Sequence, residues 1–246
     1  MSLAAALALG AAFAFKAQAV IILPYLLYLV IAKQFPIRHL FLVPFVYIVM
    51  MIPAALAGRP WLELLSIYVH QAQTYHHLAL NAPNLYTLLQ DFGLLSYEKG
   101  LVIGSVIAAF IGLGVTLGGL KFRARGTNLL IAPTETNLLI ATTSAVLLPF
   151  VLPKMHDRYF FVADVFTFLL AFAVPTGWRV AVLVQLGSIF AYTKFLLGFS
   201  LGPTIGAALM TGAVVCLFQT IVEYWNRTSP RPEVSRRSWH PPPAAN

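Results

Sequence analysis

A series of long apolar runs, separated by short polar gaps, constrains the fold of this chain more than any other feature of its sequence. The runs cover about residues 3–32, 40–58, 101–120, 137–152, 160–175, 180–197 and 204–225. A helix needs about 20 apolar residues to cross the hydrocarbon core of a bilayer. Charged residues make up only 10% of the chain, against about 25% in soluble domains. We therefore predict an all-α, polytopic transmembrane bundle of about seven spans in residues 1–225.

The first run, residues 3–32, is too long for one straight membrane helix. At about 1.5 Å per residue it would extend about 45 Å, so we expect either two pieces or one span with an extension outside the membrane. Its beginning has neither the basic n-region nor the clear cleavage site of a signal peptide. We interpret this run as membrane helix.

The positions of Lys and Arg predict which ends of the runs face the cytoplasm, because basic loop residues favour that side. Residues 226–246 form a tail rich in Pro, Ser and Arg. We predict that this tail is disordered and cytoplasmic, either fully solvated or touching anionic lipid. Alternation from the tail places the other basic gaps on the cytoplasmic side, and it places about residues 59–100 and the short turn near residue 156 on the opposite side.

The net charge of +8 does not indicate nucleic-acid binding, because the basic residues lie in the gaps and the tail rather than on one face of a soluble module. The single cysteine, Cys216, excludes an intramolecular disulfide and a cysteine-based metal site. The sequence carries no eukaryotic sorting signal, which favours the bacterial inner membrane as its location.

The turn LPKMHDRYFFVAD, residues 152–164, gathers ionisable side chains between two apolar runs. Lys154, His156 and Arg158 are suited to an anion such as phosphate, because an ammonium, an imidazole and a planar guanidinium all donate to phosphate oxygens. The same residues are also suited to a charged belt at the membrane surface, anchored by neighbouring aromatic rings. Spacing alone leaves both interpretations open.

Other ionisable groups lie inside or beside the apolar runs, where a charge is costly without a partner. Asp157 and Asp164 are expected to form structural ion pairs with a cation of the turn. Lys16 either extends to the headgroups from the end of a span or, together with Gln18, faces a polar cavity.

The polar segment between residues 59 and 100 carries amides, hydroxyls and aromatic rings, which hold a neutral polyol such as a sugar by hydrogen bonds and stacking. These groups include Tyr68, Gln71, Asn81, Asn84 and Tyr86. Apolar residues recur with helical spacing through residues 61–69, which predicts a helix on the membrane surface. His70 and His77 share one helical face, but the further ligands of a metal site are missing from the pattern, and no metal is predicted.

Three segments resemble blocks of one family of membrane enzymes: FKAQAVIILPYLL, YVHQAQTYHHLALNAPNLYTLL and LPKMHDRYFFVADV. The family is that of the integral-membrane glycosyltransferases related to GPI mannosyltransferase II, in the GT-C superfamily. The similarity covers about residues 1–200, in the order that the family uses. The third block is the most specific, since it follows the pattern Pro-Lys/His-Met-His-Glu/Asp-Arg-Tyr, with Asp157 where Glu is commoner.

The resemblance implies a multi-span enzyme that takes a sugar from a polyprenyl-phosphate carrier and transfers it on the non-cytoplasmic side. The lipid-linked sugar is then a substrate, no further cofactor is implied, and mannose is the default sugar. The residues implied in binding the donor phosphate are Lys154, His156, Arg158 and Lys16. Those implied in binding the sugar or the acceptor are Tyr68, Gln71, Asn81, Asn84, Tyr86 and Gln18.

The chain departs from the family because it has no counterpart of the N-terminal half, in which GT-C enzymes place a catalytic carboxylate. We therefore expect a C-terminal portion that binds donor but transfers sugar only with a partner chain or segment, and the catalytic residue stays unassigned. The alternative is a non-catalytic membrane subunit or scaffold derived from such an enzyme. A transporter is disfavoured, because the polar residues gather at one face rather than along the midplane.

Overall fold

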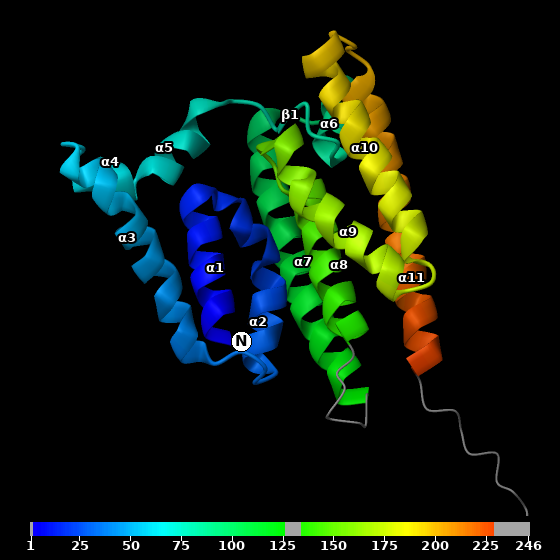
Figure 1. Cartoon of the computed structure of the whole chain (residues 1–246). Helices are drawn as coiled ribbons and strands as arrows, with labels where there is room; N and C mark the ends of the chain where they lie inside the picture. Colours follow the sequence, from blue (N-terminus) through cyan, green and yellow to red (C-terminus); the bar gives the residue numbers. More distant parts are fainter. Residues whose placement is uncertain (1, 126–133, 229–246) are drawn as a thin grey trace, which may run out of the picture.

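A computed structural model describes residues 2–125 and 134–228, and the fold in these ranges is helical (Figure 1). The elements are α1 (Ser2–Phe15), η1 (Ala17–Ile22), α2 (Leu23–Ile31), η2 (Ile37–Phe41), α3 (Leu42–Leu56), α4 (Trp61–Leu65), α5 (Ile67–Thr74), β1 (Ala79–Leu80), α6 (Leu85–Asp91), α7 (Tyr97–Arg125), α8 (Thr134–Val151), β2 (Met155–His156), η3 (Asp157–Phe160), α9 (Phe161–Ala173), α10 (Gly177–Leu197) and α11 (Gly202–Thr228). The η elements are 3-10 helices. The predicted disordered tail lies almost entirely outside the described residues.

Five of the described helices are long and apolar enough to cross a membrane, so the chain is an integral membrane protein by length and composition. They are Ile37–Leu56, Tyr97–Ala124, Thr134–Val151, Gly177–Leu197 and Gly202–Thr228. The run near residues 160–175 forms α9, which has only 13 residues. The predicted count of about seven spans is therefore higher than the five that the described helices provide.

The first apolar run forms two pieces, one of the two arrangements expected for it. Helix α1 ends at Phe15, and the 3-10 helix η1 begins at Ala17, so the chain bends at Lys16. Lys16 itself is extended, with φ −160° and ψ 134°. Helix α1 packs against α3, whereas α2 packs against α7. The bend thus exposes Lys16 at one end of the bundle, between two apolar helices.

The helices form a bundle with α8 at its centre. Every residue of α8 from Leu139 to Val151 is buried, because α7 lies on one side and α9 on the other, with η1 also in contact. Polar side chains on α8 donate to backbone carbonyls, as in Ser144 to Ile21 at 2.6 Å and Thr143 to Leu139 at 2.7 Å. Such internal partners are required where no water is present.

Helices α10 and α11 make the most extensive contact between two helices in the described part of the chain. A Cβ atom added at Gly206 would lie 2.6 Å from the carbonyl oxygen of Gly187, so only glycine permits this separation of the two backbones. Small residues at helix contacts are typical of membrane bundles, where packing rather than hydrophobic burial drives association.

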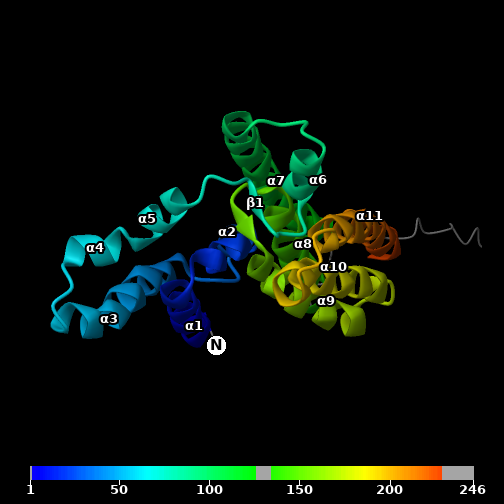
Figure 2. The same cartoon turned by 90° about the horizontal axis from the view of Figure 1, so that it is seen from above.

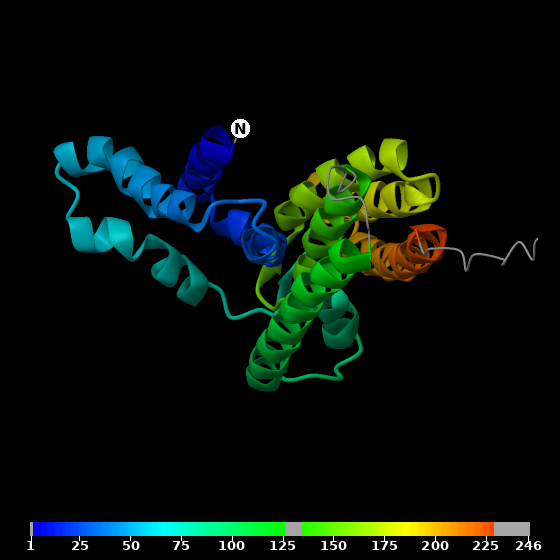
Figure 3. The same ribbon diagram turned by 90° about the horizontal axis from the view of Figure 1, so that it is seen from below.

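The segment predicted as a surface helix forms two short helices, α4 and α5, which meet at Ser66. Together with α3 they extend away from α9–α11, as the views from above and below show (Figures 2 and 3). Beyond α5 the chain returns to the bundle through β1 and α6. The loop containing residues 79–91 and the turn containing residues 152–160 thus lie at one end of the bundle, which we call the outer end.

Candidate functional site

The outer loop and the charged turn are joined by backbone hydrogen bonds. Strand β1 pairs in parallel with β2, with Ala79 opposite Met155 and Leu80 opposite His156. The Lys154 amide donates to the carbonyl of Leu78 at 2.7 Å, just before this pair. Two segments about 75 residues apart in the sequence are therefore held in one register at the outer end.

Two residues beside this strand pair adopt left-handed backbone conformations. The φ angles are 56° at Asn81 and 61° at Lys154. Asparagine tolerates this region, whereas a lysine there carries a strain of about 1–2 kcal/mol. Backbone strain of this kind gathers at functional sites, which makes the turn a candidate site on geometric grounds.

The bend after α1 brings a third segment to the same place. The side-chain amide of Gln18 donates to the carbonyl of Arg158 at 2.9 Å. The ammonium of Lys16 lies over the ring of Tyr159, 5.1 Å from its centroid, which is within the range of a cation–π contact. The first and third of the sequence blocks therefore meet, although about 140 residues separate them.

Three cationic or imidazole side chains from these segments influence one another electrostatically: Lys16, His156 and Arg158, which we call the outer cationic cluster. Partial desolvation lowers the pKa of Lys16, and the Arg158 charge lowers it further, while Asp157 opposes the shift. Burial also lowers the pKa of His156, with Asp157 raising it and the charges of Arg158 and Lys16 lowering it. An anion bound among these groups would relieve their mutual repulsion.

Aromatic rings surround the outer cationic cluster. The His156 ring lies between Tyr75 and Tyr159, at centroid distances of 5.5 and 5.3 Å. The side chain of Arg158 is 72% exposed, so the cluster is open at the surface of the molecule. This combination of cations and aromatic faces is suited to a phosphate group that carries a sugar.

Lys154, the fourth predicted phosphate ligand, has a different neighbour. Its ammonium lies 5.5 Å from the centroid of Tyr97, at the beginning of α7, and Tyr97 in turn contacts His76. Tyr97 was not singled out from the sequence, because nothing in its spacing connects the start of α7 with the turn. The pairing of β1 with β2 is what sets Lys154 in this position.

Two predicted sugar-binding residues are buried and already engaged. Asn84 is fully buried and caps α6, accepting from the amides of Tyr86 at 3.1 Å and Thr87 at 3.2 Å. It also donates to the carbonyl of Leu152 at 3.4 Å. Tyr86 is 2% exposed and donates to the carbonyl of Val151 at 2.8 Å. Both residues fasten α6 to the end of α8, and their contacts with a sugar stay a prediction.

The other predicted sugar-binding residues are dispersed. The Tyr68 hydroxyl donates to the carbonyls of Phe13 and Ala14. These hydrogen bonds attach α5 to the end of α1 and use the hydroxyl proton of Tyr68. Gln71 is exposed on α5. Asn81 forms an isolated bridge with His156 and lines a small polar cavity of about 80 Å³ beside the start of α11. Asn81 and Gln18, like Asn84, thus contact the charged turn.

The two aspartates expected in ion pairs behave differently. Asp157 is buried, and its carboxylate accepts from the Arg158 amide at 2.7 Å and lies 3.7 Å from the Arg158 guanidinium. Asp164 instead accepts from the hydroxyl of Ser188 on α10 at 2.7 Å, and it takes part in none of the ion pairs among the described residues. Its place on α9 directs it towards α10, which removes it from the cations of the turn.

In the part of the chain that the structure describes, no group of three or more His, Cys, Asp or Glu residues is arranged to hold a metal ion. Comparison of the chain with protein-family models, with curated proteins and with solved structures gives no match in any of the three.

Proposed function

We propose that the chain binds a polyprenyl-phosphate-linked sugar at its outer end, as the donor-binding portion of a membrane glycosyltransferase of the GT-C type. The observation that carries this proposal is the convergence of Lys16, His156 and Arg158 from segments distant in sequence. This convergence requires both the bend at Lys16 and the strand pair at His156. A charged belt at the membrane surface would require neither the bend nor the strand pair, so the convergence favours a binding site.

The cluster also lies where a lipid-linked substrate is presented. It is located at the ends of apolar helices, so a phosphate at the headgroup level reaches the cations while the attached hydrocarbon remains in the bilayer. Gln18 and Asn81 border the cluster with polar groups that can contact a sugar. These features support a donor with both a lipid and a sugar part.

Catalysis of sugar transfer also needs a base that takes the acceptor proton. Asp157 is unsuited to this role because it is buried and bound to Arg158. Glu63 is paired with Arg59 at 3.3 Å on α4. We propose neither carboxylate as the base, and we propose that the described residues bind the donor while another chain or segment supplies the base.

Binding of polyprenyl phosphate to the purified full chain tests this proposal, with the matching polyprenol as the ligand that lacks phosphate. We expect binding that depends on the phosphate and that Arg158→Ala weakens about tenfold or more, because a hydrogen bond to a charged group contributes about 1.5–3 kcal/mol. Isothermal calorimetry in detergent, or quenching of intrinsic tryptophan fluorescence, measures the affinity.

Arg59→Ala is the matched control, since Arg59 is an exposed arginine that pairs with Glu63 on α4. It should bind polyprenyl phosphate as the wild type does. Equal binding of the phosphate and the polyprenol, or unchanged affinity in Arg158→Ala, would contradict the proposed function and favour a non-catalytic subunit.

A further inference from the structure

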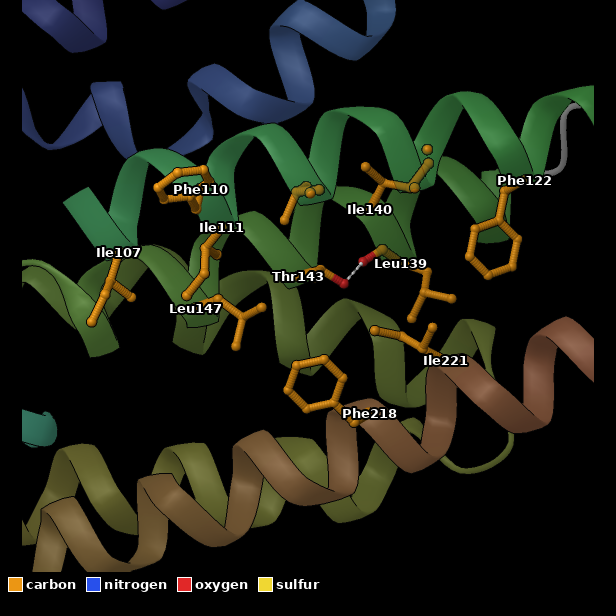
Figure 4. A pocket seen from close by; sticks show the side chains of 14 residues that line it. Ile107, Phe110, Ile111, Phe122, Leu139, Ile140, Thr143, Leu147, Phe218 and Ile221 are labelled. Carbon is orange, nitrogen blue, oxygen red and sulfur yellow. Dashed lines mark hydrogen bonds between the residues drawn. The ribbon is translucent and has the colours of Figure 1, made fainter. Parts of the chain in front are cut away.

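A second feature of the molecule lies away from the outer cationic cluster, in a groove between α7, α8 and α11 (Figure 4). Its volume is about 540 Å³, and its lining is apolar, with Ile107, Phe110 and Phe122 from α7, Leu139 and Leu147 from α8, and Phe218 from α11. The one lining residue with a polar side chain, Thr143, donates to the Leu139 carbonyl of its own helix at 2.7 Å. The groove therefore offers a ligand only hydrocarbon contacts.

The groove exists because α7 lacks side chains along this face. Gly114 and Gly118 both line it, and a Cβ atom added at either would meet nothing within 4 Å. The exposed rings of Phe110 and Phe218 stand at its rim, 69% and 52% exposed. Since α7 and α11 are candidate membrane spans, this recess lies at the depth of the hydrocarbon core.

The groove is elongated along the helix axis. From Ile107 to Phe122 it follows α7 for about 22 Å, at about 1.5 Å per residue. This elongated shape and its hydrocarbon lining are suited to an extended hydrocarbon chain.

At the outer end of the groove, the Tyr86 hydroxyl of α6 packs against α7 at Gly104, about one turn before Ile107, and donates to the carbonyl of Val151. This contact closes the direct path along α7 towards the outer end. We therefore place the headgroup of a bound chain at the opposite end.

That opposite end carries an aromatic residue and a cation at the edge of the groove. The Phe122 ring meets Trp225 edge to face at 4.8 Å, and the ammonium of Lys121 lies 5.9 Å from the centroid of Trp225. Tryptophan and lysine are typical of the membrane interface, where they contact lipid headgroups. Arg123 and Arg227 add positive charge at this end, while Glu135 offsets one charge and Arg179 pairs with Glu223.

We propose that the groove binds one acyl chain of an anionic phospholipid, whose headgroup lies beside Lys121 and Trp225. The groove supplies a fixed recess for the chain, and the local excess of positive charge selects an anionic headgroup. By the charge rule this is the cytoplasmic leaflet. The site is independent of the proposed function, because closure by α6 separates it from the outer end.

Native mass spectrometry of the delipidated full chain tests this site, after mixing with equal amounts of phosphatidylglycerol and phosphatidylcholine with identical acyl chains. We expect the wild type to retain phosphatidylglycerol preferentially. Gly114→Leu combined with Gly118→Leu should abolish retention, because the new side chains enter the recess at positions where an added Cβ atom meets nothing within 4 Å. Lys121→Gln should lower the preference for phosphatidylglycerol about fivefold, since one lysine near an anionic surface contributes about 1 kcal/mol.

Two controls accompany these variants. Gly212→Ala changes a glycine of α11 whose added Cβ would make an ordinary contact with Leu183, away from the groove, and should retain lipid normally. Arg38→Gln removes an exposed positive charge on η2 and should not alter the preference. Thermal unfolding of each variant establishes that it is folded.

Retention of phosphatidylglycerol in the filled variant at the wild-type level would overturn the groove as the binding site. If Lys121→Gln and Arg38→Gln altered the preference equally, the assignment of the headgroup would be wrong. A wild-type chain that retains phosphatidylglycerol but does not bind polyprenyl phosphate would contradict the proposed function and leave the groove site standing. Failure of the groove site and failure of the proposed function are therefore distinguishable.

Discussion

The two ends of the bundle use the same chemistry but are assembled differently. At each end a lysine lies over an aromatic ring, Lys16 over Tyr159 at 5.1 Å and Lys121 over Trp225 at 5.9 Å. The pair with Lys121 comes from the ends of two neighbouring long helices, α7 and α11. The pair with Lys16 depends on a bend and on a strand pair between distant segments. The outer end should therefore be sensitive to buried residues that touch no ligand, whereas the opposite end should not.

Among the changes that test this difference between the two ends, Asn84→Ala is expected to have the largest effect. The change leaves two buried amides of α6 and the carbonyl of Leu152 without their partner, which should lower the free energy of unfolding by about 1–3 kcal/mol. Thermal unfolding in detergent measures this loss. Binding of polyprenyl phosphate should weaken as well, because α6 and β1 support the turn, while phosphatidylglycerol retention should persist.

Gln71→Ala is the control for that variant, since Gln71 is exposed on α5 and the change should alter stability by less than about 0.5 kcal/mol. Equal stability of the Asn84 and Gln71 variants would show that Asn84 is available to a ligand, as the resemblance implied.

Removing the lysine charge at one end of the bundle, and then at the other, tests whether the two ends bind their ligands independently. Lys16→Gln should weaken polyprenyl-phosphate binding about tenfold, because it removes one charge-assisted contact, and should leave phosphatidylglycerol retention unchanged. Lys121→Gln should do the reverse. If each variant affected both ligands, the two ends would form one continuous site, and the closure by α6 would have no functional meaning.

The smallest expected effect is the pH dependence that His156 contributes to stability. Burial lowers its pKa in the folded state below the ordinary value of 6.5, so the unfolded chain binds more protons between the two values. Stability should therefore fall as pH decreases below about 6.5. The titratable and charged side chains near His156 are those of Tyr75, Tyr159, Asp157, Arg158 and Lys16.

Thermal unfolding at pH 7.5 and at pH 5.5 measures this contribution, with His156→Gln as the comparison, because glutamine does not titrate. The variant should lose less stability on acidification than the wild type does. An identical decrease in both proteins would assign the pH dependence to other groups.

The sequence predicted the helical class and most of the long helices, because hydrocarbon spans must satisfy their backbone hydrogen bonds internally. The hydrogen-bond partners of the polar residues could not be read from local spacing. Asn84 and Tyr86 have the groups of a sugar site, and in the fold they donate to the carbonyls of Leu152 and Val151, which lie about 65 residues away in the chain. Asp164 accepts from Ser188 on another helix. The roles predicted for these residues stay predictions.

The sequence by itself determined that this chain lies in a membrane, through the length of its apolar runs, and it indicated the charged turn through residue types that bind phosphate. Only the tertiary structure decided which of those residues meet. The bend at Lys16, the parallel pairing of β1 with β2 and the groove along Gly114 and Gly118 all depend on contacts between distant segments. Such contacts are set by packing in three dimensions, which no local periodicity records.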